Sequence, residues 1–160
     1  MAAFTDRDTR RLEAQVKASE GYRLTAFHSN DGALTVGYGH DCSLSPVSGV
    51  AKAGDRIRPE QAESLFQKDL ASTVWSIRRT FPWVRTLSPA RQAVIYEVGF
   101  SMGIGVSGPS GLNSLNSLLR DMEAGDYDGA SNALQESDWA RRSSPRAHRL
   151  AKQLETGEWQ

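Results

Sequence analysis

The residues best suited to chemistry lie in two short segments, Glu20–Leu24 and Thr35–His40, with a turn-forming stretch between them. Glu20 stands where a helical pattern ends, and the partial negative charge of a helix C-terminus disfavours the ionised carboxylate. A carboxyl group that keeps its proton near neutral pH can act as a general acid. Asp31, in the turn, adds a second carboxyl group. Two carboxyl groups that flank a cleft can cleave a glycosidic bond: one protonates the leaving oxygen, and the other stabilises positive charge or activates a water.

The same residues also have an ordinary structural interpretation. Most glutamates at helix ends are solvated surface residues, and Asp31-Gly32 is a common turn pair. A hairpin with glycine-rich flanks is a weak motif by itself. The local features alone therefore leave both interpretations open.

Periodicity predicts the elements that would position these groups. Thr5–Ser19 has helical spacing, and Gly21 is suited to end this helix in the left-handed conformation. Arg23–His28 and Ala33–Val36 look extended and flank the turn cluster Ser29–Gly32. This arrangement predicts a β-hairpin directly after the first helix.

The residue pattern after the hairpin predicts helices and no further strands. Pro59 suits the first position of a helix that runs to about Ile77, and Ser88-Pro89 predicts the start of another. That second helix is apolar on most sides, so we expect it to be buried. After a glycine-rich connection over 103–111, three shorter helices are expected at about 112–124, 127–135 and 145–154. Strands near the N-terminus followed by helices predict an α+β protein.

Composition limits the classes of function. The chain has 160 residues, 39% hydrophobic and 24% charged, as in a globular domain that needs no metal or disulfide for stability. Lysine plus arginine number 19 and aspartate plus glutamate 19, which argues against nucleic-acid binding through bulk positive charge. The single cysteine, Cys42, has no histidine at ligand spacing, which argues against a zinc site. No other metal and no organic cofactor is implied. No apolar stretch predicts a signal peptide or a membrane span.

A series of motifs runs in order along most of the chain. Glu20-Gly-x-Arg-Leu24 and Thr35-Val-Gly-Tyr-Gly-His40 come first. The later ones are Ala62-Glu-x-Leu-Phe-x-x-Asp69, Phe100-Ser-Met-Gly103, Asn116-Ser-Leu118, Ser137-Asp-Trp139, Pro145-Arg-Ala-x-Arg149 and Thr156-Gly-Glu-Trp159. Together they cover roughly residues 12–159 and resemble the phage-type lysozymes of the T-even phage class, glycoside hydrolase family 24. Several motifs in register are far more specific than any one of them.

The resemblance implies a two-lobed lysozyme-like fold in a single domain over residues 1–160. The N-terminal lobe would span about 12–58, a connecting helix about 59–78 and a mostly helical C-terminal lobe about 79–160. The implied activity is that of a muramidase, which hydrolyses the β-1,4 bond between N-acetylmuramic acid and N-acetylglucosamine in bacterial peptidoglycan, with inversion. The substrate would lie in the cleft between the lobes.

The resemblance also assigns roles to individual positions. Glu20 takes the general-acid position, and Thr35 takes that of the catalytic threonine beside the attacking water. Arg146 matches the arginine that faces the catalytic glutamate. His40 and Asp69 match a structural ion pair, so we expect His40 not to be catalytic. The residues at or near sugar-contacting positions are Phe100, Ser117 and Asn132.

Alternatives stay open for the sugar-contacting residues. Phe100 serves equally well as a core residue, and Ser117 fits only after a shift of one position. Ala133 stands where the family often has a polar contact. Either the helical register brings the adjacent Asn132 to that subsite, or the subsite is weaker.

The chain departs from the family at the second catalytic position. The family has an acidic residue, or sometimes a cysteine, nine positions after the glutamate, and here that residue is Ser29. We favour Asp31 as the replacement, brought in by a differently shaped turn. Alternatively, Ser29 positions water while Glu20 carries most of the catalysis, or activity is weakened and the chain is a wall-binding module. A site with one glutamate also leaves lytic transglycosylation open.

A basic cluster near the C-terminus has two interpretations. It attracts anionic wall polymer or stem-peptide carboxylates, or it is a solvated helix face. We expect Arg146 in the cleft and the other members on the surface. These are Arg141, Arg142, His148, Arg149 and Lys152.

The expected partner is peptidoglycan, with no nucleic acid and no membrane insertion, and the expected state is a monomer, alone or within a larger virion protein. An endolysin without a signal peptide would wait in the host cytoplasm and act on the wall in the periplasm. A virion-associated domain would open the wall during genome entry. The family's Gly-x-Trp ending falls at Gly157-x-Trp159, so we expect no separate wall-binding domain, which fits both settings.

Overall fold

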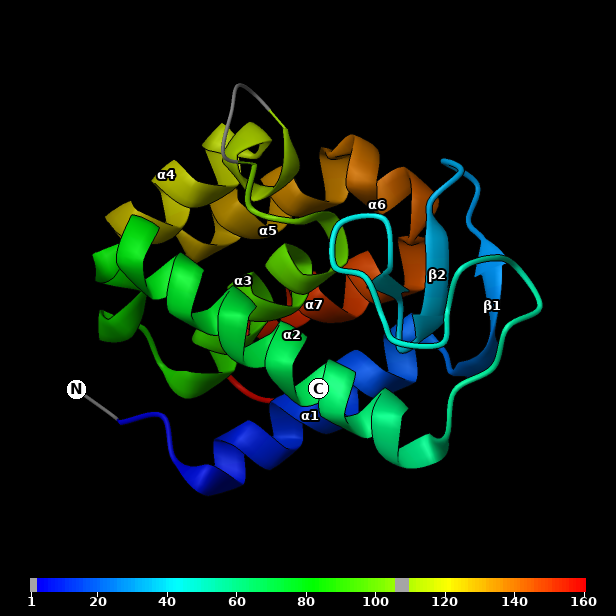
Figure 1. Ribbon diagram of the computed structural model, residues 1–160. Coiled ribbons are helices and arrows are strands. Elements are labelled where there is room, and N and C mark those ends of the chain that lie inside the picture. The colour runs from blue at the N-terminus through cyan, green and yellow to red at the C-terminus, as the bar shows by residue number, and fades with distance from the viewer. Residues whose placement is uncertain (1–2, 106–109) are drawn as a thin grey trace. The chain divides into compact units, whose positions relative to one another are not determined.

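The computed structural model describes residues 3–105 and 110–160, which form two compact units. The sheet unit comprises Ala14–Ser72, and the helical unit comprises the chain up to Glu13 together with Thr73–Gln160. Figure 1 shows a small antiparallel sheet and a mostly helical remainder, which confirms the predicted α+β class. The predicted division into two lobes and a connecting helix stays a prediction.

The helical unit is built around α3 (Pro89–Met102), in which every residue from 92 to 99 is buried. The predicted start of this helix is confirmed: the Ser88 side chain accepts a hydrogen bond from the Arg91 backbone N–H, and proline follows in the first turn. The predicted burial of this helix is also confirmed.

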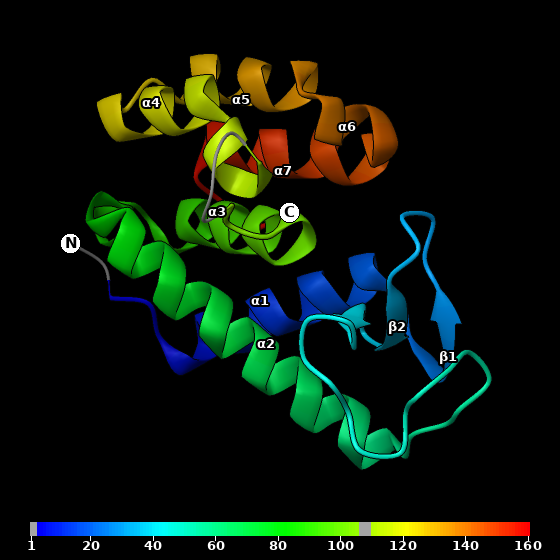
Figure 2. The same cartoon turned by 45° about the horizontal axis from the view of Figure 1, so that its top comes forward.

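Four further helices lie within this unit. They are α4 (Asn116–Ala124), α5 (Tyr127–Glu136), α6 (Asp138–Arg142) and α7 (Ser144–Thr156). Helix α5 packs between α4 and α7, and α7 packs on α3 (Figure 2). The predicted helix over 112–124 is instead a 3₁₀ turn, η2 (Gly111–Ser114), followed by α4. Of the predicted glycine-rich connection, Gly108 lies outside the described residues.

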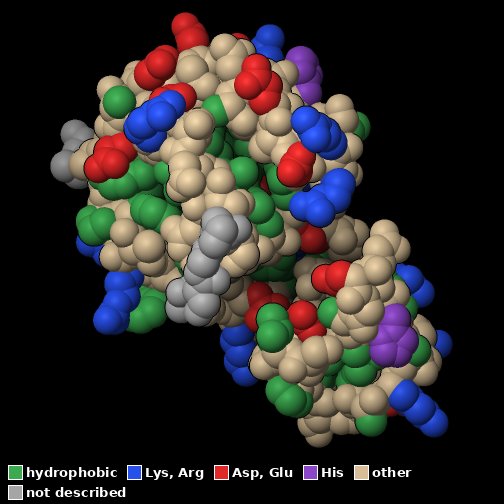
Figure 3. Space-filling view, turned by 90° about the horizontal axis from the view of Figure 1, so that it is seen from above, with side chains coloured by type: hydrophobic (Ala, Val, Ile, Leu, Met, Phe, Trp, Pro, Cys, Tyr) green, Lys and Arg blue, Asp and Glu red, His purple; other side chains and the backbone are tan. Residues whose placement is uncertain are grey.

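The surface of the helical unit carries charges of both signs. Figure 3 shows acidic and basic side chains interspersed over its visible face, in keeping with the equal numbers of each in the sequence. Within residues 3–105 and 110–160, no helix is both long enough and apolar enough to cross a membrane.

The sheet unit contains the end of α1 (Asp6–Glu20), the three strands and the first part of α2 (Pro59–Thr80). The sheet is antiparallel in the order β1 (Arg23–His28), β2 (Leu34–Gly37) and β3 (His40–Asp41), which confirms the predicted hairpin. Strand β3 escaped prediction because two residues are too few to show an alternating pattern.

Gly21 and Pro59, the residues that flank the sheet region, have the backbone conformations that the sequence predicts. Gly21 follows α1 with a φ of +73°, the left-handed conformation predicted to end that helix. Pro59 is the first residue of α2, as predicted. The N–H group at this position makes no hydrogen bond within a helix, so proline costs nothing by lacking it. These two residues therefore set where the chain enters and leaves the sheet region.

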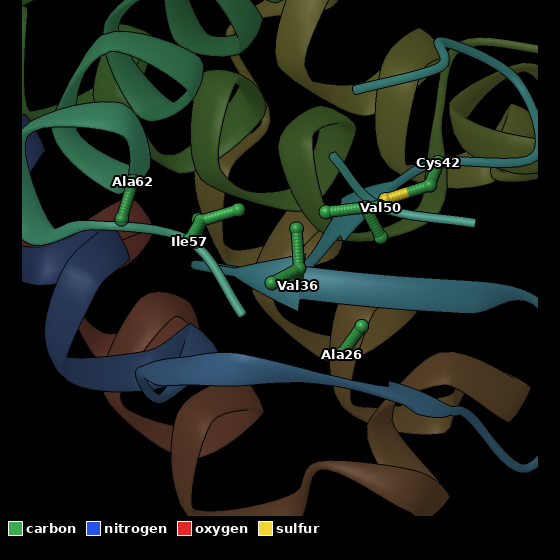
Figure 4. Close-up of a cluster of buried hydrophobic side chains, with 6 residues drawn as sticks. All are labelled: Ala26, Val36, Cys42, Val50, Ile57 and Ala62. Atoms are coloured by element: carbon green, nitrogen blue, oxygen red, sulfur yellow. The ribbon is translucent and has the colours of Figure 1, made fainter. Parts of the chain in front are cut away.

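The sheet unit has its own hydrophobic core, drawn in Figure 4. Its buried members are Ala26, Val36, Cys42, Val50, Ile57 and Ala62. Part of this core comes from the irregular loop before α2, which main-chain hydrogen bonds tie to β1. The Ala26 N–H donates to the Asp55 carbonyl at 2.8 Å, and the Ile57 N–H donates to the Leu24 carbonyl at 2.9 Å. The strands that carry candidate site residues are thus held by both core packing and the loop.

Candidate functional site

Four predicted site residues lie in the sheet unit: Glu20, Ser29, Asp31 and Thr35. Glu20 is the last residue of α1 and is partly buried. Thr35 lies in the central strand β2 and is 8% exposed, while Ser29 and Asp31 belong to the turn between β1 and β2. The proposed acid and the hairpin groups therefore share one compact unit.

The turn between β2 and β3 lies close to the Glu20 carboxylate. Gly39 has a φ of +78°, and a Cβ atom built on it would lie 3.2 Å from Glu20 Oε2. Such a contact is tighter than most real Cβ contacts. A side chain at this position would therefore press on the carboxylate, which would have to shift by a few tenths of an ångström, and the positive φ favours glycine there.

The turn between β1 and β2 is tied together by its own polar groups. The Ser29 hydroxyl donates to the Asp31 carboxylate, and the Ala33 N–H lies 3.4 Å from Asp31 Oδ1. The hydrogen bond from Ser29 lowers the pKa of Asp31, which keeps this exposed carboxylate ionised. Ser29 and Asp31 thus act as one local unit, with the serine orienting the aspartate.

The Thr35 hydroxyl is positioned as a hydrogen-bond acceptor. It donates its proton to the Ala33 carbonyl at 3.0 Å, so its lone pairs remain to accept from another group. In the sheet, Thr35 is flanked by Phe27 of β1 and Asp41 of β3. Strand pairing on both sides therefore holds the hydroxyl in place.

His40 forms the predicted structural ion pair with Asp69. Its Nδ1 lies 2.7 Å from Asp69 Oδ2, and its Nε2 lies 2.8 Å from the Ser45 carbonyl oxygen. The hydrogen bond to Asp69 raises the pKa of His40, because a protonated ring can donate to both acceptors. The ring is 5% exposed. Both ring nitrogens are occupied, which supports the expectation that His40 is structural.

The stabilising effect of this ion pair should depend on pH. Because the pKa of His40 is raised on folding, its contribution is complete below the ordinary histidine pKa of about 6.5 and is lost as pH rises through the folded-state value. Asp69→Asn should therefore lower the free energy of unfolding by about 1–2 kcal/mol at acidic pH and by less at pH 9. Urea unfolding at a series of pH values measures this difference.

The control for this measurement is Asp138→Asn, which breaks the exposed Asp138–Arg141 pair of 2.8 Å. Arginine does not titrate in this range, so the effect of that change should not vary with pH. A loss in Asp69→Asn that is equally independent of pH would contradict the ion-pair interpretation of His40.

The other four predicted residues, Phe100, Ser117, Asn132 and Arg146, lie in the helical unit. A groove of about 370 Å³ includes Ser117 and also Ala133, the position assigned to a sugar contact. Its lining residues are Ser114, Leu115, Asn116, Ser117, Leu118, Ala133, Glu136 and Ser137. Asn132 is exposed but does not line the groove. Phe100 is partly buried near the end of α3.

Arg146 is bound to a buried carboxylate that sequence reasoning missed. Its Nε donates to Glu97 Oε1 at 2.9 Å, and a terminal nitrogen of Arg149 donates to the same oxygen at 2.6 Å. The Glu97 side chain is 0% exposed. Arg149, expected on the surface, is 27% exposed and is partly buried by its bond to Glu97. A single acidic residue within the apolar run of α3 was the signal that could have identified this network.

Within residues 3–105 and 110–160, no three or more histidine, cysteine, aspartate or glutamate side chains form a group that could hold a metal ion.

Comparison with known proteins identifies the family. Residues 17–153 match the model of the phage lysozyme family. The chain is 27% identical to the pre-baseplate central spike protein Gp5 of Enterobacteria phage T4, over 91% of this chain and 28% of that protein. It is 28% identical to an endolysin of Acyrthosiphon pisum secondary endosymbiont phage 1, over 72% of this chain and 69% of the endolysin.

A third relative is the probable T4-type lysozyme 1 of Dictyostelium discoideum, 23% identical over 91% of this chain and 94% of that protein. The chain thus spans 28% of the T4 spike protein's length but nearly the whole of this smaller relative. The family match covers most of the chain, including the segments that carry Glu20 and Thr35. This chain belongs to the phage lysozyme family.

Proposed function

We propose that this protein is a muramidase that hydrolyses the β-1,4 bond between N-acetylmuramic acid and N-acetylglucosamine in peptidoglycan. The observation that carries the proposal is the position of Glu20, at the end of α1 and against the β2–β3 turn, in a chain of the phage lysozyme family. Glu20 protonates the glycosidic oxygen as the bond to the anomeric carbon breaks. The proton then stays on the departing hydroxyl group.

A water attacks the anomeric carbon from the opposite face, which inverts the configuration there. The acceptor character of the Thr35 hydroxyl suits it to orient this water. Asp31, held ionised by Ser29, is our candidate for the group that takes the proton from the water. An inverting arrangement requires about 6.5–9.5 Å between the two carboxyl groups, which leaves room for the water.

The products distinguish the proposed reaction from its chemical alternative. Hydrolysis adds one water, so each cleavage leaves a reducing N-acetylmuramic acid end. Lytic transglycosylation leaves a 1,6-anhydro end that is lighter by one water. Mass spectrometry of muropeptides released from purified peptidoglycan should detect only the reducing form. Anhydro products would overturn the hydrolytic assignment.

The role of Asp31 predicts a selective loss of rate. Asp31→Asn should lower the turnover of purified peptidoglycan about 100-fold, because the amide cannot accept the proton from water. Asp55→Asn is the matched control: Asp55 is also a loop carboxylate of the sheet unit, and a hydrogen bond from the Ala51 N–H lowers its pKa. Equal rates in both variants would exclude Asp31 as the base and favour water held by Ser29.

Replacing Gly39 with alanine should reduce activity by more than the loss of stability explains. In Gly39→Ala the added carbon would press on Glu20, and alanine is strained at positive φ by about 1–3 kcal/mol. In Gly49→Ala the φ is similarly positive, at +84°, but nothing lies within 4 Å of the added carbon. Both variants should lose similar stability, whereas the hydrolysis rate of Gly39→Ala should fall about tenfold further. Equal hydrolysis rates in Gly39→Ala and Gly49→Ala, at equal stability, would show that position 39 does not affect Glu20.

The helical unit supplies our candidates for saccharide contacts: Ser117, Asn132, Phe100 and Arg146. The groove that contains Ser117 supports the assignment of that residue, because a serine hydroxyl can hydrogen-bond sugar hydroxyl and acetamido groups. Arg146 is proposed to contribute positive charge toward the acidic groups of the wall. Its hydrogen bond to Glu97 holds the guanidinium in one orientation.

A wall-binding module with little activity is the second candidate, favoured by Ser29 at the position where the family has an acid. Such a module would sediment with insoluble peptidoglycan without releasing soluble sugars. The relatives include both an endolysin and a spike protein. We therefore propose action on the wall from the periplasmic side, by a monomer or as part of a virion protein, without choosing between these settings.

A further inference from the structure

A second pocket of the helical unit combines three arginines with an exposed tryptophan. It has a volume of about 420 Å³ and is lined by Trp75, Arg78, Arg79, Pro82 and Arg85. These residues come from the end of α2 and from η1 (Pro82–Thr86). Trp75 is 62% exposed, although a side chain of this size is usually largely buried. None of the residues assigned to the proposed hydrolytic site lines this pocket.

The positive charge of this pocket has no acidic counterpart in the described chain. Within residues 3–105 and 110–160, no carboxylate forms an ion pair with Arg78, Arg79 or Arg85. Like charges gathered around one pocket repel each other, and a bound anion would relieve that repulsion.

A buried hydrogen-bond chain orients Arg78. Its Nε donates to the Tyr96 hydroxyl at 2.8 Å, and that hydroxyl donates to Gln92 Oε1 at 3.0 Å. The Gln92 amide in turn donates to the Leu87 carbonyl at 2.9 Å. Tyr96 and Gln92 are 0% and 2% exposed, so the chain is anchored in the core. It uses only the Nε donor of Arg78, and the terminal N–H groups stay available for a ligand.

The indole and the guanidinium groups suit two parts of one ligand. The guanidinium group of an arginine can bind two phosphate oxygens at once through paired, charge-assisted hydrogen bonds. The guanidinium carbon of Arg79 lies 5.2 Å from the centre of the Trp75 ring, which keeps the positive charge beside the indole. An exposed aromatic face packs well against the C–H face of a sugar ring.

We propose that this pocket binds a phosphate ester carried on a sugar ring, as part of a phosphorylated glycan of the bacterial envelope. The phosphate is bound by Arg78, Arg79 and Arg85, and the sugar stacks on Trp75. The choice of a glycan as the carrier rests on the proposed function, whereas the preference for phosphate rests on the arginines alone. The site tethers the protein to its target and takes no part in bond cleavage.

Titration with N-acetylglucosamine 1-phosphate, followed by NMR on the full chain, tests the proposal. Its dissociation constant should be about tenfold lower than that of N-acetylglucosamine or inorganic phosphate alone, since the pocket has a contact for each part. Trp75→Ala, Arg79→Gln and Arg85→Gln should each weaken binding about tenfold. Arg23→Gln is the matched control, because Arg23 is also exposed and stacks on an aromatic ring, that of Phe27, but lies in the sheet unit.

Several results would overturn the site. They are no saturable binding of the sugar phosphate, equal binding of inorganic phosphate, or unchanged binding in Trp75→Ala. Tighter binding of a short single-stranded oligonucleotide would replace the glycan with a nucleic acid. Hydrolysis of peptidoglycan, measured on the same samples, separates the two proposals. Glu20→Gln should bind the sugar phosphate normally, and the three pocket variants should cleave soluble wall fragments at the wild-type rate.

Discussion

Glu20→Gln is expected to reduce peptidoglycan hydrolysis by about 10²- to 10⁴-fold, the usual contribution of a general acid. Glutamine keeps the size of the side chain and its carbonyl oxygen, so the contact with the β2–β3 turn should survive. It cannot deliver a proton to the glycosidic oxygen at neutral pH. The loss should therefore appear in turnover and leave wall binding intact.

The rate is measured as clearing of outer-membrane-permeabilised Gram-negative cells and as release of reducing ends from purified peptidoglycan. Glu63→Gln is the control, because Glu63 belongs to the same unit and pairs with Lys17 at 2.7 Å on the surface. That variant should keep the wild-type rate. Equal clearing by wild type and Glu20→Gln would remove Glu20 from the acid role. Wall binding without clearing by the wild type would favour the binding module.

Glu97→Gln is expected to lower the free energy of unfolding by about 3–5 kcal/mol, the cost of removing one partner from a buried ion pair. The Glu97 side chain is 0% exposed, and two guanidinium groups donate to the same carboxylate oxygen. The amide keeps an acceptor but removes the negative charge that balances Arg146 and Arg149. Both arginines would then lose that balancing charge in a partly buried setting.

Urea unfolding followed by far-ultraviolet circular dichroism measures this loss, with Asp138→Asn as the control. Asp138 also pairs with an arginine in the helical unit, but its side chain is 87% exposed, so solvent screens the interaction. The control should have a midpoint close to that of the wild type. A loss below about 1 kcal/mol in Glu97→Gln would mean that packing, and not the charge, holds the two arginines.

Helix boundaries in this chain were predictable where local signals are strong. Ser88-Pro89 marks the start of α3, Pro59 opens α2, and Gly21 ends α1 in the left-handed conformation. Each signal acts through backbone groups within about four residues, so no distant partner is needed to recognise it. Helix α6 was missed because five residues show too little periodicity, although the Ser137 side chain caps it by accepting from the Ala140 N–H.

Predictions about side-chain partners were less successful when the partners were distant in sequence. The pairing of His40 with Asp69 was expected from family motifs and is confirmed. The attachment of Arg149 to Glu97 was not expected, because these residues are 52 positions apart. Likewise, the approach of Gly39 to Glu20 depends on how the β2–β3 turn folds back toward the end of α1. The roles of Glu20, Asp31 and Thr35 stay predictions until the variants are measured.

The sequence by itself determined the fold class, the order of the longer elements and the family, because caps, turns and ordered motifs are local features that can be recognised without a structure. Apart from the His40–Asp69 pair, the tertiary structure decided which groups far apart in sequence meet. It buried Glu97 between two arginines and gathered three arginines around Trp75. These contacts depend on how the helices and loops pack in three dimensions. The periodicity of one segment indicates its secondary structure and does not indicate which other segment it packs against.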